Sequence, residues 1–336
     1  MNIGFIKVTP QIENTSGVRI QAIEWKKGLE SCGHQVLMIN IWEDIDWTTI
    51  DMVIIFEYGG ILKEWVLELK KLNVKILLAP IIDTNKSKFF FGLAARFLGS
   101  KSLKIRSKFN DLYSIVSLVD GFLVRSEYEK AFFTKSLGVN DNLVHIVRLP
   151  FRLKYKSEEY TKSNFCLHVS RLASKNKNVS LLCKAAKKYK FHLVLAGMLN
   201  GEQEKQWLEG LIEQSDGYVE YVGLLSDEQL SIYYQKAKVF ALPSTFEGVG
   251  LVALEAALFG CEIVLTKNGG PKEYFKGMCT LVDPYDIDDI GKAVCCYLDG
   301  VLSYQPKLAE FIKEEYSPEK TIGTLSNIIN QLNFRK

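Results

Sequence analysis

Residues 243–273 read PSTFEGVGLVALEAALFGCEIVLTKNGGPKE, and this stretch is more informative about the fold than any other. A short buried strand (VFAL, 239–242) is expected before it, and the Pro-Ser pair ends that strand. Gly248 and Gly250 allow a sharp turn, after which an Ala- and Leu-rich helix is expected from about 249 to 259. A helix that begins at a glycine loop after a parallel strand favours a phosphate, because its free N–H groups and its dipole are positive there.

Two glutamates flank this expected anion site. Glu247 precedes the helix, and Glu255 lies about two turns along it. A carboxylate can accept two hydrogen bonds from neighbouring sugar hydroxyls. With a pyrophosphate at the helix start, one glutamate can hold a donor sugar and the other a ribose, which is the outline of a nucleotide-sugar site. The simpler alternative is an ordinary strand–helix–strand unit with two solvated glutamates.

The same stretch resembles the E-x7-E signature of the family 4 retaining glycosyltransferases, PS-x-x-EG-x-G-L-x-x-LEA-x-x-x-G. The matching residues are Pro243, Ser244, Glu247, Gly248, Gly250, Leu251, Leu254, Glu255, Ala256 and Gly260. Gly269, Gly270 and Glu273 continue the match, because they resemble the family's GG-x-x-E. The resemblance implies the GT-B fold, an α/β fold of two Rossmann-like, doubly wound parallel-sheet domains that face each other across a cleft.

Composition limits the class of protein. The chain has 336 residues, of which 47% are hydrophobic and 24% charged, a balance typical of two globular domains. A net charge of +3 is too small to predict a nucleic-acid partner. Seven cysteines without CxxC spacing indicate reduced thiols, and no apolar run reaches the roughly 18 residues of a membrane span. A strand is expected where a signal peptide would begin, so we expect a cytoplasmic protein.

Strand-like and helix-like segments alternate along both halves, which predicts parallel sheets. Strands are expected at 3–8, 35–39, 52–56, 75–79, 121–124 and 144–147, and then at 165–169, 192–196, 218–222, 239–242, 262–265 and 280–282. With the resemblance, this pattern predicts an acceptor-side domain at 1–150, a linker at 151–163 and a nucleotide-sugar-binding domain at 164–315. A final helix at 316–336 is expected to cross back to the first domain.

Two cations follow the first strand of the second half. Arg171 and Lys177 lie in a loop before an apolar helix, where a guanidinium can grip two oxygens of a pyrophosphate and an ammonium adds a point charge. The loop resembles the family's GR-L-x-x-x-K-N, with Ser170 in place of the glycine. Lys175 competes with Lys177 for the place of the family's lysine. The alternative to a clamp is a solvated basic loop.

The resemblance also implies the remaining contacts of the donor and the acceptor. The implied donor-binding residues are Gly17, Gly223, Gly248, Val249, Gly250, Leu251 and Glu255. On the acceptor side, Asp83 matches the aspartate of a His-Asp pair whose histidine is replaced by Ile82. Glu127 matches a glutamate at the end of the fifth strand, where it is either an acceptor contact or a helix N-terminal carboxylate.

No metal site is expected. Asp286 and Asp288 form a D-x-D pattern, but they open a helix, where aspartates suit the N-terminal dipole. The four histidines have no metal-ligand spacing.

Residues 85–110 combine seven cations with aromatic side chains and contain no acidic residue. A basic amphipathic segment of this kind can lie on an anionic membrane surface. The alternative is a helix with a core-facing apolar stripe and a solvated basic side.

Together, the resemblance implies a retaining, metal-independent hexosyltransferase-type enzyme without a cofactor. It would move a sugar from a nucleoside-diphosphate sugar, with UDP favoured, to a saccharide or lipid-linked acceptor in surface polysaccharide or glycolipid synthesis. Arg171, Lys177 and Glu247 would be its catalytic residues. Two alternatives remain: an inactive relative that stabilises a partner glycosyltransferase, and another GT-B enzyme such as a sugar-nucleotide epimerase.

Overall fold

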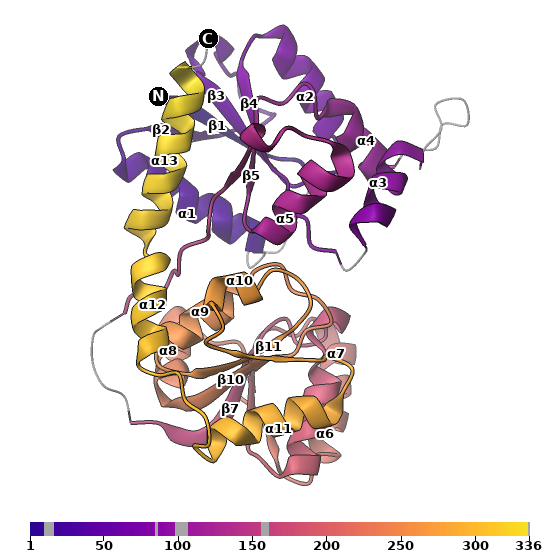
Figure 1. The fold of residues 1–336 in the computed structure, drawn as a ribbon, viewed down its shortest axis with the longest axis vertical. Coiled ribbons are helices and arrows are strands. Elements are labelled where there is room, and N and C mark those ends of the chain that lie inside the picture. Colours follow the sequence, from indigo (N-terminus) through magenta and orange to yellow (C-terminus); the bar gives the residue numbers. More distant parts are fainter. Residues whose placement is uncertain (10–16, 85–86, 98–106, 156–160, 335–336) are drawn as a thin grey trace. The chain divides into compact units, whose positions relative to one another are not determined.

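The computed structural model describes residues 1–9, 17–84, 87–97, 107–155 and 161–334. Contacts between Cα atoms divide the chain into two units. The first unit is Met1–Pro150 together with Pro318–Lys336, and the second is Phe151–Ser317 (Figure 1). Each unit is built around its own sheet and its own hydrophobic core.

The sheet of the first unit has the strand order β2-β1-β3-β4-β5-β6. Its strands are β1 Asn2–Lys7, β2 Gln35–Met38, β3 Met52–Phe56, β4 Lys75–Ala79, β5 Gly121–Val124 and β6 Val144–Ile146, all paired in parallel. Its helices include α1 Gly17–Ser31, α2 Leu62–Lys71, α3 Lys88–Phe97, α4 Lys108–Ile115 and α5 Glu127–Ala131. β3 is buried at every residue because strands of a parallel sheet are covered on both faces.

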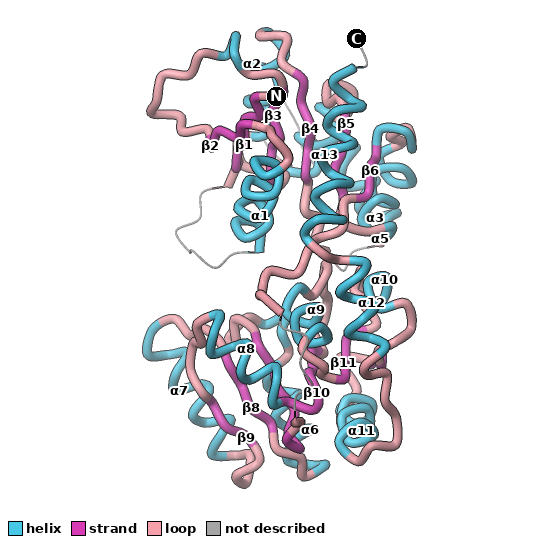
Figure 2. The backbone as a smooth tube through the Cα atoms, turned by 90° about the vertical axis from the view of Figure 1, so that its left-hand side faces the viewer, coloured by secondary structure: helices cyan, strands magenta, loops and turns pink. Residues whose placement is uncertain are grey.

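The sheet of the second unit has the order β12-β11-β10-β7-β8-β9, also fully parallel. Figure 2 labels β8, β9, β10 and β11 of this sheet. Its strands are β7 Ser163–Val169, β8 Leu193–Ala196, β9 Val219–Tyr221, β10 Ala237–Leu242, β11 Glu262–Thr266 and β12 Thr280–Val282. Its helices are α6 Val179–Tyr189, α7 Gly201–Glu213, α8 Asp227–Lys236, α9 Leu251–Leu258, α10 Lys272–Phe275, α11 Ile287–Leu298 and α12 Lys307–Glu315. The prediction of two doubly wound parallel sheets is confirmed.

The last helix, α13 (Pro318–Phe334), lies in the first unit and contacts α1 (Figure 1). Gly28 makes this contact close, because a Cβ placed there would lie only 2.5 Å from Ile322 Cγ1. His34 Nε2 and Ser326 Oγ hydrogen-bond at 2.9 Å between the two ends of the chain. The two termini of the sequence therefore fold as parts of one unit.

α3 carries an exposed aromatic face. Phe89 is 77% exposed, Phe90 53% and Phe97 74%, whereas Phe91 is buried in the core of the first unit. Of the predicted basic residues, Lys86, Lys101, Lys104 and Arg106 lie outside the described residues. Among the described residues, no helix combines the length and the apolarity that a membrane crossing needs.

Candidate functional site

Three loops meet at the carboxyl edge of the second sheet. The loop after β7 joins the loop after β10 through a hydrogen bond from Thr245 N–H to the Asn176 carbonyl, 2.8 Å long. The loop after β10 joins the loop after β11, because Gly270 N–H donates to the Glu247 carbonyl at 3.2 Å. Gly269 permits this approach, since a Cβ there would lie 1.9 Å from that same carbonyl oxygen. Parallel strands place ligands at this edge of a sheet.

These loops bring Lys177 and Glu247 together. Lys177 Nζ donates to Glu247 Oε2 at 2.7 Å, and Ser244 Oγ donates to the same oxygen at 3.1 Å. The two charged side chains are only 21% and 14% exposed, so their attraction is screened less than at an open surface. Two of the three predicted catalytic residues are therefore in direct contact.

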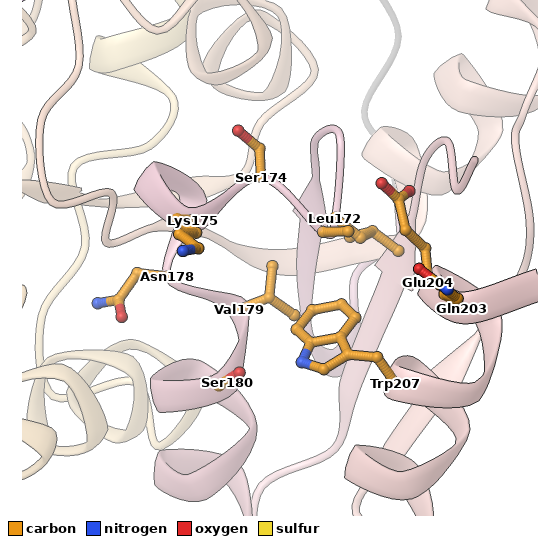
Figure 3. A pocket seen from close by; sticks show the side chains of 10 residues that line it. Leu172, Ser174, Lys175, Asn178, Val179, Ser180, Gln203, Glu204 and Trp207 are labelled. Atoms are coloured by element: carbon orange, nitrogen blue, oxygen red, sulfur yellow. The ribbon is translucent and has the colours of Figure 1, made fainter. Parts of the chain in front are cut away.

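The competing lysine, Lys175, lies elsewhere in the same loop. It lines a cavity of about 430 Å³ between the start of α6 and α7, with Trp207 opposite Val179 (Figure 3). The structure thus places Lys177 against Glu247 and Lys175 in a separate hollow.

The start of α9 forms the positive end of this loop cluster. Gly250 is the N-cap of α9 with φ 76° and ψ 52°, in the left-handed region that glycine adopts without strain. As a glycine, Gly250 has no side chain to cap the helix, so no carboxylate or hydroxyl at the N-cap position neutralises the first N–H groups. Gly248, Val249 and Leu251 lie in this turn, and the helix dipole there favours an anion.

Glu255 lies in the second turn of α9 and is almost completely buried, with 1% of its surface exposed. Arg152 Nε donates to its Oε1 at 2.9 Å. Glu255 Oε2 is also buried and has no hydrogen-bond partner among the described residues. Burial raises the pKa of Glu255, and the charge and hydrogen bonds of Arg152 oppose that rise. Sequence reasoning missed Arg152, which stood in the predicted linker without any motif.

The other predicted donor residues lie around the same edge or in the first unit. Arg171 follows β7 with an exposed side chain. Gly223 has φ 87° and accepts a hydrogen bond from Gly197 N–H at 2.9 Å through its carbonyl. Gly17 begins α1 in the first unit, and no atom of the described residues lies within 4 Å of where its Cβ would be.

His168 and Ser170 support the floor of the site. His168 is fully buried in β7; its Nδ1 lies 2.8 Å from the Ala241 carbonyl oxygen and its Nε2 lies 2.7 Å from Ser170 Oγ. Because the carbonyl can only accept, Nδ1 donates to it, and in the neutral ring Nε2 accepts from the Ser170 hydroxyl. Burial lowers the pKa of His168 to about 4.

In the first unit, Asp83 pairs with a buried arginine. Arg125 Nη2 donates to Asp83 Oδ1 at 2.8 Å, and Arg125 Nε donates to Glu129 Oε2 at 3.0 Å. Ile82 is buried and donates its N–H to Glu129 Oε1 at 2.5 Å. Glu127 is exposed in the first turn of α5, whereas Glu129 is the buried carboxylate that Arg125 and the Ile82 N–H contact. Its signal in the sequence was the Arg-x-x-x-Glu spacing of 125–129.

The D-x-D aspartates are used as helix caps and ion-pair partners. Asp286 Oδ1 accepts from the N–H groups of Asp288 and Asp289 at the start of α11. Asp288 Oδ1 accepts from Tyr189 Oη at 2.7 Å and pairs with Lys188. Within the described ranges, no cluster of three or more His, Cys, Asp or Glu side chains could hold a metal ion.

The two sheets and their connections define a GT-B protein, and solved structures agree. The chain is similar to a sucrose-phosphate synthase from Thermosynechococcus elongatus, with a TM-score of 0.76, 16% identity and 98% of each chain covered. It is also similar to Anabaena HepE in complex with UDP-glucose, with a TM-score of 0.72 and 15% identity. The match covers 98% of this chain and 100% of that chain. At these identities the likeness concerns the fold.

Sequence comparisons support one family. Residues 151–315 match the model of the family described as "Glycosyl transferases group 1". The O-antigen chain mannosyltransferase B of Escherichia coli is 32% identical over 103 residues, which are 30% of this chain and 26% of that protein. An uncharacterized glycosyltransferase of Haemophilus influenzae is 28% identical over 292 residues, covering 83% of this chain and 76% of that protein. Residues 151–315, just under half of the chain, are therefore similar to the group 1 glycosyltransferases.

Proposed function

We propose that this protein is a retaining glycosyltransferase that takes its sugar from a nucleoside-diphosphate sugar. The observation that carries the proposal is the contact between Lys177 and Glu247 beside the uncapped start of α9. A cation and a helix N-terminus together suit a diphosphate, and a neighbouring carboxylate suits the hydroxyls of the attached sugar. HepE, which shares the fold, was solved with UDP-glucose, and this favours UDP as the carrier.

In the proposed reaction, the bond between sugar C1 and the diphosphate oxygen breaks, and its electron pair stays on the diphosphate. Arg171, Lys177 and the start of α9 stabilise the negative charge that develops there, which is the role that fixed charges and dipoles play in transferases. The acceptor hydroxyl attacks C1 from the same face, and its proton passes to the departing phosphate oxygen. Glu247 holds the donor sugar, Glu255 holds the ribose, and no metal takes part.

A transfer assay with labelled donor sugars and a lipid or saccharide extract tests this proposal. Arg171→Ala and Glu247→Ala are each expected to lower turnover by roughly tenfold or more while the protein stays folded. Lys177→Ala and Lys175→Ala decide between the two lysines, because a loss is expected only for Lys177→Ala. Near-wild-type turnover of both Arg171→Ala and Glu247→Ala would refute the assignment of the site.

One observation favours a second function, that of an inactive protein which binds and stabilises a partner glycosyltransferase. Ile82 occupies the place of the histidine that the resemblance implies, and its side chain is buried. It therefore supplies no imidazole to a reacting sugar. In that case the wild-type protein would capture a glycosyltransferase in pull-downs and transfer no label itself.

We further propose that the acceptor is a saccharide or a lipid-linked molecule. We also propose that the exposed aromatic face of α3 lies on an anionic membrane surface. Phe89, Phe90 and Phe97 can enter the headgroup region while neighbouring cations contact lipid phosphates. In this proposal the enzyme works at the inner face of a cell membrane, in surface polysaccharide or glycolipid synthesis.

A further inference from the structure

Arg152 lies two residues beyond Pro150, where the chain passes from the first unit into the second. Its guanidinium contacts two carboxylates from two helices. Nε donates to Glu255 Oε1 of α9 at 2.9 Å, and Nη1 lies 3.2 Å from Asp227 Oδ1 at the start of α8. The Arg152 side chain is 23% exposed, Glu255 1% and Asp227 60%, so the guanidinium connects a buried carboxylate to a solvated one.

The pairing has a clear electrostatic consequence for Glu255. A buried carboxylate without a cation is costly, and it protonates or turns away from the low-dielectric interior. Arg152 is the cation that opposes this for Glu255 among the described residues. Arg152 therefore favours the ionised form of Glu255, and its hydrogen bond at Oε1 holds the carboxylate plane.

Only one carboxylate oxygen is used by this contact. Glu255 Oε2 has no partner among the described residues, and the hydroxyl of buried Tyr234 also lacks one. Of the described side-chain atoms that are buried without a partner, Glu255 Oε2 is the one carboxylate oxygen. Such a group is unusual, because folded proteins satisfy nearly all buried polar atoms. Glu255 Oε2 is therefore an acceptor that a ligand hydroxyl can use once it reaches this turn of α9.

We propose that Arg152 is a positioning residue for the donor nucleotide: it holds Glu255 so that its free oxygen binds a ribose hydroxyl. The inference rests on the proposed function, since it assumes that a nucleotide occupies the site. It also means that ribose recognition depends on a residue of the segment joining the two units, and not on the E-x7-E stretch alone.

A purely structural role is the competing explanation, and the surroundings of Arg152 make it a serious one. Phe151 N–H donates to the Tyr316 carbonyl at 3.3 Å, and Leu153 is buried, so this segment is fixed to the second unit on both sides of Arg152. If Arg152 only helped to fasten the segment, its loss would weaken every ligand alike. If it positions Glu255, its loss would affect only ligands that carry ribose hydroxyls.

The test compares a nucleotide with its counterpart lacking those hydroxyls. Wild-type protein is titrated calorimetrically with UDP, GDP and ADP, and the tightest of the three is compared with its 2′,3′-dideoxy form. The wild type is expected to prefer the ribonucleotide by roughly tenfold or more, as for hydrogen bonds to a charged group. In Arg152→Gln the preference is expected to fall to about one, because Glu255 is no longer held as an oriented carboxylate.

Lys154→Gln is the matched control, because it removes the same charge from an exposed residue of the same segment, and the wild-type preference is expected to remain. If Arg152→Gln does not fold, Arg152→Lys is titrated, and a drop in preference of roughly threefold or more is expected because an ammonium lacks the planar fork. An unchanged preference, or equal losses for both ligands, would overturn the inference alone. Binding of none of the three nucleotides by the wild type would refute the proposed function and this inference with it.

Discussion

His168 links one residue's ionisation to the stability of the whole second unit. It is buried in β7 as a neutral ring, with its pKa lowered to about 4 by burial. In the unfolded chain the same side chain titrates near its ordinary value of about 6.5. As pH falls below about 6.5, the unfolded state gains a proton that the folded state does not, so the free energy of unfolding falls. The free energy of unfolding keeps falling until the pH reaches the pKa of His168 in the folded protein, about 4.

Between about pH 7.5 and pH 5, His168 alone is expected to remove about 2 kcal/mol from the free energy of unfolding of the second unit. Urea unfolding at both pH values measures this loss. In His168→Gln the pH dependence should shrink by that amount, whatever the variant's stability at neutral pH. Equal pH dependence in His168→Gln and wild type would contradict the prediction.

Two contacts between single residues show what could and what could not be predicted from the sequence. The proximity of Lys177 and Glu247 was predictable, because each follows a strand and parallel strands end at one edge of the sheet. Arg152 was not predictable in this way. It follows no strand and belongs to no motif, and only the packing of the segment after Pro150 brings it to Glu255. Periodicity and motifs locate residues on elements, whereas the path of an irregular segment is set by tertiary contacts.

Strands were the most predictable elements. The strands β3, β4, β5 and β12 have the predicted bounds, because short apolar runs flanked by turn signals leave few alternatives. The ends of helices were less predictable than the ends of strands. Helix α9 spans Leu251–Leu258, which is shorter than the predicted 249–259. The helix begins later than predicted because Gly250 adopts a left-handed conformation. Glycine permits this conformation, but the presence of a glycine does not predict it.

The exposed face of α3 is the element whose function can be tested directly. Wild-type protein is expected to sediment with vesicles of anionic phospholipid and not with neutral ones, because bound cations each contribute about 1 kcal/mol there. One variant replaces the aromatic anchor with Ser at Phe89, Phe90 and Phe97. A second variant removes positive charge by substituting Gln at Lys86, Lys88, Lys101 and Lys104. Each set should weaken vesicle binding by roughly tenfold or more.

The control for the aromatic set is Tyr285→Ser, since Tyr285 is 70% exposed but lies in the second unit. It should bind vesicles as the wild type does. The proposal is contradicted if the wild type does not bind anionic vesicles, or if the Phe→Ser and the Lys→Gln variants both bind them as tightly as the wild type. In that case α3 is only an amphipathic helix with a solvated side.

At the scale of the whole molecule, the first unit depends on the last helix of the chain. α13 buries Ile322, Leu325, Ile329 and Leu332, and Lys75 Nζ donates to the Asn333 carbonyl at 3.1 Å. Burial of four such side chains is worth roughly 6 kcal/mol or more, against a typical total of about 5–15 kcal/mol for a domain. A chain that ends at Ser317 should therefore keep the second unit folded and lose the first.

Hydrogen exchange followed by mass spectrometry measures this separately in each unit. In the shortened chain, amides of β1, β3 and α1 should lose most of their protection, while those of β7, β10 and α9 should keep it, because the second unit's core contains no residue of α13. Gly323→Ala is the control within α13. Open space surrounds that position, so the variant should be as stable as the wild type or more so by about 1 kcal/mol. Retained protection of β1 and α1 after removal of α13 would show that residues 1–150 fold without it.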